Sequence, residues 1–181
     1  MRWLPILLLL VSSNAALALP AHAPVPGGVA IIEVPEMAGA APRATYRDRR
    51  VMVLPGDDQY RAIVGLPLST KPGEHKLQLK GTDGSRAVIS FTVTDKAYAE
   101  QRLTITNKRK VNPYAEDMDQ IRADRKRINA ALESWSEPGS VQLEMIRPVD
   151  GIESSPFGLR RFYNDEPRNP HSGLDIAADT G

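Results

Sequence analysis

Short apolar runs separated by turns fill residues 29–106, and this pattern constrains the fold more than any other feature of the chain. In the clearest run, apolar side chains occupy alternate positions, namely Ala87, Ile89, Phe91 and Val93. A period of two is typical of a strand that buries one face. Leu77 and Leu79 repeat this period just before a turn at residues 81–84. The pattern therefore predicts a sheet with one face in a core.

Further short runs cover residues 50–54, 60–64 and 103–106, and turn signals such as Pro72-Gly73 lie between the runs. Several short strands at this spacing are typical of a sandwich of two sheets. We therefore expect a mainly β chain, whose residues 29–106 form an immunoglobulin-like β sandwich.

The pattern changes at Asn112-Pro113. Asn can cap a helix, and Pro fits the first helical turn because the N–H that it lacks has no partner there. Apolar residues then recur every three or four positions, at Tyr114, Met118, Ile121, Ile128, Leu132 and Trp135. The spacing predicts one linking α-helix from Asn112 to about Ser134, ended by Pro138-Gly139, whose apolar stripe packs on a neighbouring domain. Helix and linker together cover residues 107–139.

A second domain is expected over residues 140–181, beginning with a strand from Val141 to Ile146. About 40 residues are too few for an independent core without disulfides or a metal. We therefore expect this domain to be incomplete within the 181 residues.

Residues 1–23 have the pattern of a secretory signal peptide. Arg2 gives a positive start, and an apolar stretch from Leu4 to Val11 follows. Cleavage after Ala18 or after Ala23 fits the small-residue rule, and an uncleaved anchor is the alternative. The apolar stretch is shorter than the roughly 20 residues of a spanning helix, and no later segment approaches that length. The sequence predicts export, with no integral membrane span after signal removal.

Composition excludes several kinds of site and partner. The chain has no Cys, so disulfides, thiolate metal sites and a lipid-modified cysteine are excluded. Removing the leader takes away only Arg2 and leaves 22 basic and 22 acidic residues. A neutral chain argues against nucleic acid as the main partner, because phosphate binding needs a basic face. The basic clusters at residues 108–110 and 125–127 are interpreted as a solvated face, with an anionic polymer as the alternative.

His171 and Asp175 are the strongest candidate site residues. Zinc hydrolases bind their metal through His nitrogen and carboxylate oxygen and keep one position open for water. Pro170 and Gly173 disfavour a helix, so we expect an extended segment in which positions 171, 173 and 175 share a face. His171 and Asp175 then point together across Gly173. An isolated pair of this spacing is more often a surface His and a turn Asp.

Other candidates have weaker support. His75 follows Pro72-Gly73 and is predicted to be an exposed turn residue. The adjacent carboxylates Asp165-Glu166 and Asp57-Asp58 diverge from each other, so we interpret both pairs as solvated turns rather than acid–base pairs.

Two motifs near the end of the chain resemble the start of the catalytic domain of lysostaphin/LytM-type zinc metallopeptidases, which cut peptide cross-links of bacterial peptidoglycan. Residues 155–160 read Ser-Pro-Phe-Gly-Leu-Arg, and residues 171–178 read His-Ser-Gly-Leu-Asp-Ile-Ala-Ala. The resemblance covers about residues 147–181, and more weakly the upstream β domain and the helix. Asp179 stands where the family often has Pro. The resemblance implies that residues 140–181 are the first part of an all-β peptidase domain.

The same resemblance assigns His171 and Asp175 as ligands of Zn²⁺. It places the third ligand and the general base in a His-x-His motif that these 181 residues do not contain, so we expect the fragment alone to be inactive. Arg160 is in the family's Phe-Gly-x-Arg segment and is interpreted as a residue of the substrate groove or as half of a structural ion pair. Phe157 and Gly158 are interpreted as packing and turn residues.

Three functions remain open at this point. The first is an exported zinc metallopeptidase that hydrolyses peptide cross-links in the bacterial periplasm or cell envelope, with peptidoglycan peptide stems as substrate and cell-envelope proteins as possible partners. The second is a catalytically degenerate regulator or activator of other wall hydrolases. The third is an exported adhesin or glycan-binding sandwich in which the His and Asp are incidental.

Overall fold

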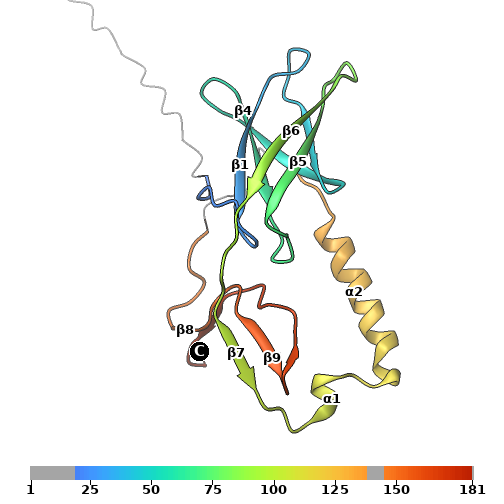
Figure 1. The fold of residues 1–181 in the computed structure, drawn as a ribbon, viewed down its shortest axis with the longest axis vertical. Helices are drawn as coiled ribbons and strands as arrows, with labels where there is room; N and C mark the ends of the chain where they lie inside the picture. Colours follow the sequence, from blue (N-terminus) through green and yellow to red (C-terminus); the bar gives the residue numbers. More distant parts are fainter. Residues whose placement is uncertain (1–18, 138–144, 181) are drawn as a thin grey trace, which may run out of the picture.

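The protein is described by a computed structural model that covers residues 19–137 and 145–180 (Figure 1). The mainly β fold predicted from the sequence is confirmed. Most of the predicted leader, the predicted helix end at Pro138-Gly139 and most of the predicted strand from Val141 to Ile146 lie outside the described residues.

Six strands form the first sheet, in the order β1-β4-β3-β2-β5-β6, and every neighbouring pair is antiparallel. Their bounds are β1 Val29–Val34, β2 Arg43–Tyr46, β3 Arg49–Pro55, β4 Tyr60–Gly65, β5 Gly73–Lys80 and β6 Arg86–Val93. The alternation predicted for Leu77, Leu79 and Val93 is present, because all three are buried.

The sheet encloses a single core. Val34 and Val64 come from the β1-β4-β3 half, Leu77 and Val93 come from the β2-β5-β6 half, and all four belong to one buried cluster. The two halves therefore pack face to face as in a sandwich. They are not separate sheets, because the β2–β3 hairpin joins them through a two-residue turn at Arg47 and Asp48. Both turn residues have positive φ, which suits the twist of a tight hairpin.

The chain then leaves this sheet to build two smaller ones. β7 Glu100–Leu103 pairs in parallel with β9 Arg160–Tyr163, which also pairs with β10 Glu166–Pro167. β8 Ile152–Ser155 pairs with β11 Asp175–Ala177. The sequence predicts a strand over residues 103–106 in the first sheet, whereas β7 begins earlier and pairs with β9. Its four residues are exposed and lack the apolar alternation that would hold them in the first core.

The helical segment differs from the prediction. α1 Lys108–Val111 ends at its cap Asn112, a 3₁₀ turn η1 covers Ala115–Asp117, and α2 covers Met118–Leu132. The predicted helix start at Asn112-Pro113 is therefore wrong. The Asp117 carboxylate accepts hydrogen bonds from the Tyr114 N–H and from the Arg109 guanidinium, which closes the 3₁₀ turn before α2 begins. The hydrogen bond from Arg109 lowers the pKa of Asp117.

The predicted packing of the helix stripe is also wrong for the described residues. α2 has no buried residue, and the side chains of Ile128 and Leu132 are 58% and 70% exposed. Contact with the first sheet comes after the helix, where the Arg50 guanidinium lies 4.2 Å from the centre of the Trp135 ring. Figure 1 shows the C-terminal end of α2 directed towards the first sheet.

Within the described residues, no helix has both the length and the apolar character needed to cross a membrane.

Candidate metal centre

The candidate site is built where β8, β9 and β11 approach one another. Ser155 is the last residue of β8, Arg161 is on β9, and Asp175 is the first residue of β11. His171 lies in the loop before β11, so the extended strand predicted from position 171 to 175 begins only at Asp175. The structure nevertheless brings His171 and Asp175 together.

Two main-chain hydrogen bonds hold His171 against the loop that follows β8. The His171 N–H donates to the Leu159 carbonyl at 2.9 Å, and the Gly158 N–H donates to the His171 carbonyl at 2.8 Å. Gly158 has a φ of 85°, a left-handed conformation in which glycine avoids the strain of other residues. The position of the imidazole is thus set by backbone pairing rather than by a strand.

The side chains of the two candidate ligands converge. His171 Nε2 lies 3.2 Å from Asp175 Oδ1, and the two side chains are 15% and 54% exposed. A side chain at position 173 would approach this pair, since a Cβ added to Gly173 would lie 3.7 Å from His171 Nε2. The imidazole is therefore held firmly while the carboxylate stays accessible to solvent and to a ligand.

The second ring nitrogen of His171 has two partners. Nδ1 lies 3.1 Å from Ser155 Oγ and 3.1 Å from the Pro156 carbonyl oxygen. The carbonyl only accepts, whereas the hydroxyl donates or accepts. Without a metal, Nε2–H can donate to Asp175 while Nδ1 accepts from Ser155. With a metal on Nε2, the proton on Nδ1 has Pro156 as its acceptor, the arrangement usual for a ligating His.

This arrangement fits zinc bound through His171 Nε2 and an oxygen of Asp175. Both donor types are common zinc ligands, and the ring nitrogen not used for the metal has a partner in either protonation pattern. Within residues 19–137 and 145–180, no group of three or more His, Cys, Asp or Glu side chains is placed to hold a metal ion. With zinc bound, His171 and Asp175 would be two of the three protein ligands typical of a zinc hydrolase.

Arg161 is the arginine that reaches the site. Its Nη2 donates to Ser155 Oγ at 2.6 Å and lies 3.9 Å from Asp175 Oδ2. Ser155 is 5% exposed, so its hydroxyl is fixed between Arg161 and His171. The guanidinium offsets the charge of the Asp175 carboxylate and holds the hydroxyl that supports the imidazole.

Arg160 is placed differently from its neighbour. Its Nη1 forms an ion pair with Glu100 Oε1 of β7 at 3.3 Å. Of the two interpretations given to Arg160, a groove residue or an ion pair, the structure contains the ion pair. Successive residues of a strand point to opposite faces, so only one of Arg160 and Arg161 can face the site. The sequence motif gave no signal for Arg161.

Tyr98 packs against the site loop, a role that no pattern in the sequence indicates. Its hydroxyl donates to the Pro26 carbonyl at 2.6 Å, and its ring lies edge-on to Phe157 with centroids 6.4 Å apart. A Cβ added to Gly158 would lie 2.1 Å from carbons of the Tyr98 ring. Gly158 therefore allows Tyr98 to connect Pro26, in the segment before β1, to the loop that positions His171.

The other histidines have partners elsewhere. His22 Nδ1 accepts from the Ile31 N–H at 3.1 Å. His75 is on β5 and half-buried, with Nδ1 2.9 Å from the Tyr46 hydroxyl and Nε2 2.8 Å from the Lys71 carbonyl, so the predicted exposed turn is wrong.

Comparisons with known proteins show which family this chain belongs to. Residues 22–96 match the family model of the peptidase family M23 N-terminal domain. A crystal structure from Pseudomonas aeruginosa, of a protein provisionally assigned as peptidase M23, is similar with a TM-score of 0.62 and 33% identity. The chain belongs to peptidase family M23. The match covers 86% of this M23 chain and 55% of the Pseudomonas chain, so the chain spans about half the length of that relative. A search of curated protein sequences finds no match.

The packing of Tyr98 on the site loop of this M23 chain is tested by Gly158→Ala. Gly84→Ala is the matched control, since Gly84 has a φ of 86° and no atom within 4 Å of an added Cβ. Both changes should lower the free energy of unfolding by about 1–2 kcal/mol, because alanine is strained in the left-handed conformation. Gly158→Ala should cost about 1–3 kcal/mol more, because the methyl group meets the Tyr98 ring. Unfolding in urea measures both losses, and equal losses would contradict the packing.

Proposed function

We propose that the whole protein is an exported zinc metalloendopeptidase that hydrolyses peptide cross-links of bacterial peptidoglycan in the periplasm or cell envelope. One observation carries the proposal. His171 Nε2 and Asp175 Oδ1 converge within 3.2 Å, and the other ring nitrogen is already engaged by Ser155 and Pro156. Membership of family M23 supports a peptidase. The sequence resemblance to LytM-type enzymes supports zinc and peptidoglycan.

Each described residue has a distinct part in the proposed reaction. When bound, zinc polarises a scissile carbonyl and lowers the pKa of its water towards about 7. His171 and Asp175 would hold the ion, and Ser155 and the Pro156 carbonyl would keep the imidazole in the ligating orientation. Arg161 holds the Ser155 hydroxyl and offsets the negative charge of Asp175. The third ligand and the general base would come from the His-x-His motif implied by the resemblance.

We propose peptidoglycan peptide stems as substrate. The resemblance of residues 155–160 and 171–178 to LytM-type enzymes supports this substrate class.

The ligand assignment predicts that His171→Ala and Asp175→Asn each remove zinc from the purified whole protein and abolish its hydrolysis of peptidoglycan. The loss in zinc affinity should exceed about 100-fold, the upper range for residues that only support a ligand. Asp179→Asn is the control, as an exposed carboxylate four residues further along. Metal content and release of wall peptides are the measurements. Full activity in either ligand variant would refute the assignment, and a wild-type protein that lacks zinc but activates another wall hydrolase would favour the regulator.

The support from Ser155 is tested separately. Ser155→Ala removes the hydroxyl between Arg161 and His171, so zinc affinity should fall about 10- to 100-fold. Ser154→Ala is the matched control, because within residues 19–137 and 145–180 the Ser154 hydroxyl forms one hydrogen bond, to the Asp175 main-chain oxygen at 3.4 Å. Competition with a zinc chelator measures both affinities. If the two variants bind zinc equally well, Ser155 does not position the ligand.

A further inference from the structure

A row of three positive charges crosses the outer face of the first sheet. Arg43 on β2 is directly opposite Lys80 on β5, and Lys80 is directly opposite Arg86 on β6. All three are exposed. Neighbouring strands are about 4.8 Å apart, so this cationic row extends over about 10 Å.

The cationic row has no acidic partner among the described residues. Like charges directly opposite each other destabilise a sheet. Within residues 19–137 and 145–180, Arg43, Lys80 and Arg86 form no ion pair with a carboxylate. Asp83, in the turn that joins β5 to β6, is instead hydrogen-bonded to the hydroxyl and the N–H of Ser85. An external anion would relieve the repulsion.

The neighbouring strand shows which anion this face accepts. Arg50 of β3 is directly opposite Thr45 of β2, so it shares the outer face, and it forms an ion pair with Glu137 at 3.6 Å, from the segment that follows α2. This face therefore already binds one carboxylate of its own chain. The cationic row lies on the same face, and none of its three cations forms an ion pair with a carboxylate of the described residues.

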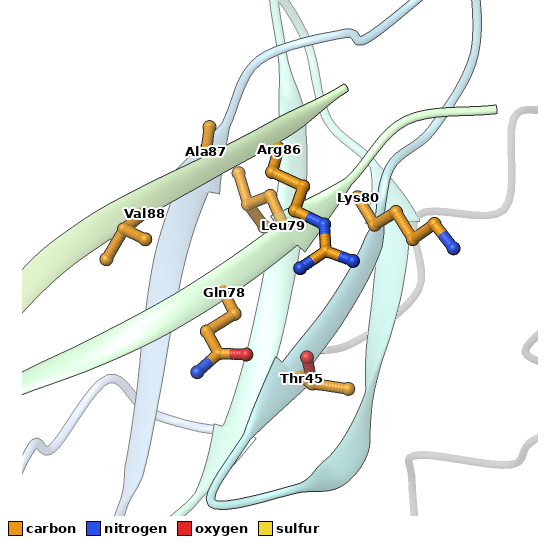
Figure 2. A pocket seen from close by; sticks show the side chains of 7 residues that line it. All are labelled: Thr45, Gln78, Leu79, Lys80, Arg86, Ala87 and Val88. Carbon is orange, nitrogen blue, oxygen red and sulfur yellow. The ribbon is translucent and has the colours of Figure 1, made fainter. Parts of the chain in front are cut away.

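A shallow depression lies beside the cationic row. Its volume of about 400 Å³ is within the roughly 300–1,000 Å³ of ligand pockets. The next cross-strand row of Thr45, Gln78 and Val88 lines it, together with Lys80 and Arg86. Figure 2 shows the side chains of Gln78 and Arg86 projecting from neighbouring strands over this surface.

The lining favours a peptide over a phosphate polymer. The Gln78 amide both donates and accepts hydrogen bonds, which matches the N–H and C=O of a peptide group, whereas phosphate oxygens only accept. Val88 is 59% exposed and offers apolar contact to a side chain. Cations, an amide and an apolar side chain together match a peptide that carries carboxylates.

We propose that this face binds a carboxylate-bearing peptide, with its carboxylates on the cationic row and its backbone over Thr45 and Gln78. The peptide is the peptide stem of peptidoglycan, an assignment that rests on the proposed function. The row belongs to the first sheet and the metal centre to the smaller ones. Binding here retains the protein on the wall while hydrolysis occurs at the metal centre.

The test is co-sedimentation of the whole protein with purified peptidoglycan sacculi. Arg43→Gln, Lys80→Gln and Arg86→Gln are combined in one variant, which should bind at least tenfold more weakly and show less dependence on salt. The control variant combines Lys71→Gln, Arg125→Gln and Lys126→Gln, which removes the same charge elsewhere and should bind as the wild type does. Thermal unfolding of the first variant should be unchanged or occur at higher temperature, because like-charge repulsion is removed.

Two further binding experiments identify the ligand. Sacculi whose carboxylates have been amidated should bind the wild type as weakly as native sacculi bind the triple variant. Polyglutamate should compete with native sacculi better than polyphosphate of equal charge does. Equal binding to amidated sacculi, or stronger competition by polyphosphate, would overturn the assignment to a carboxylate peptide.

The outcomes separate this inference from the proposed function. Cleavage of a soluble wall peptide should be the same in the triple variant and the wild type. If cleavage is normal and sacculus binding is also unchanged in the triple variant, the inference fails and the proposed function stands. If the wild type cleaves no wall peptide but its sacculus binding depends on the cationic row, the proposed function fails and the inference stands.

Discussion

The candidate site depends on the pair of main-chain hydrogen bonds between His171 and residues Gly158 and Leu159. They fix the loop that carries the imidazole, so Nδ1 faces Ser155 and Pro156 while Nε2 faces Asp175. A side chain on a free loop would lose rotamer and backbone entropy each time it bound a metal. Here most of that ordering is already part of the fold, which favours ligand binding through preorganisation.

The first domain takes part in this preorganisation. Tyr98 is bonded to Pro26 and packs on Gly158, and the β7 strand that follows it pairs with β9 beside Arg161. The segment after the first sheet is therefore not a simple tether, because it supplies a strand and a ring to the part that carries the site. The cationic row gives the same domain a second role, in which it would hold the wall polymer. Support of the site and retention on the substrate would then come from one small β domain.

The sequence predicted the features that depend on local pattern. Strict alternation located the buried residues of β5 and β6, and the motif around His171 and Asp175 led to the family that the comparisons then confirmed. Features set by tertiary contact were missed. Arg161 rather than Arg160 faces the site because of the pairing of β9 with β7, and the helix start moved because Asp117 closes a turn with Arg109. No local pattern encodes the contact between Tyr98 and Gly158, which are far apart in the chain.

The most direct test of the central claim is an anomalous diffraction map of the whole protein, crystallised with zinc and recorded at the zinc absorption edge. The account predicts a peak about 2.0–2.1 Å from His171 Nε2 and about 2.0–2.2 Å from an oxygen of Asp175, with Nδ1 still in contact with Ser155 and Pro156. A peak on Nδ1, or zinc bound at a place that involves neither residue, would contradict it.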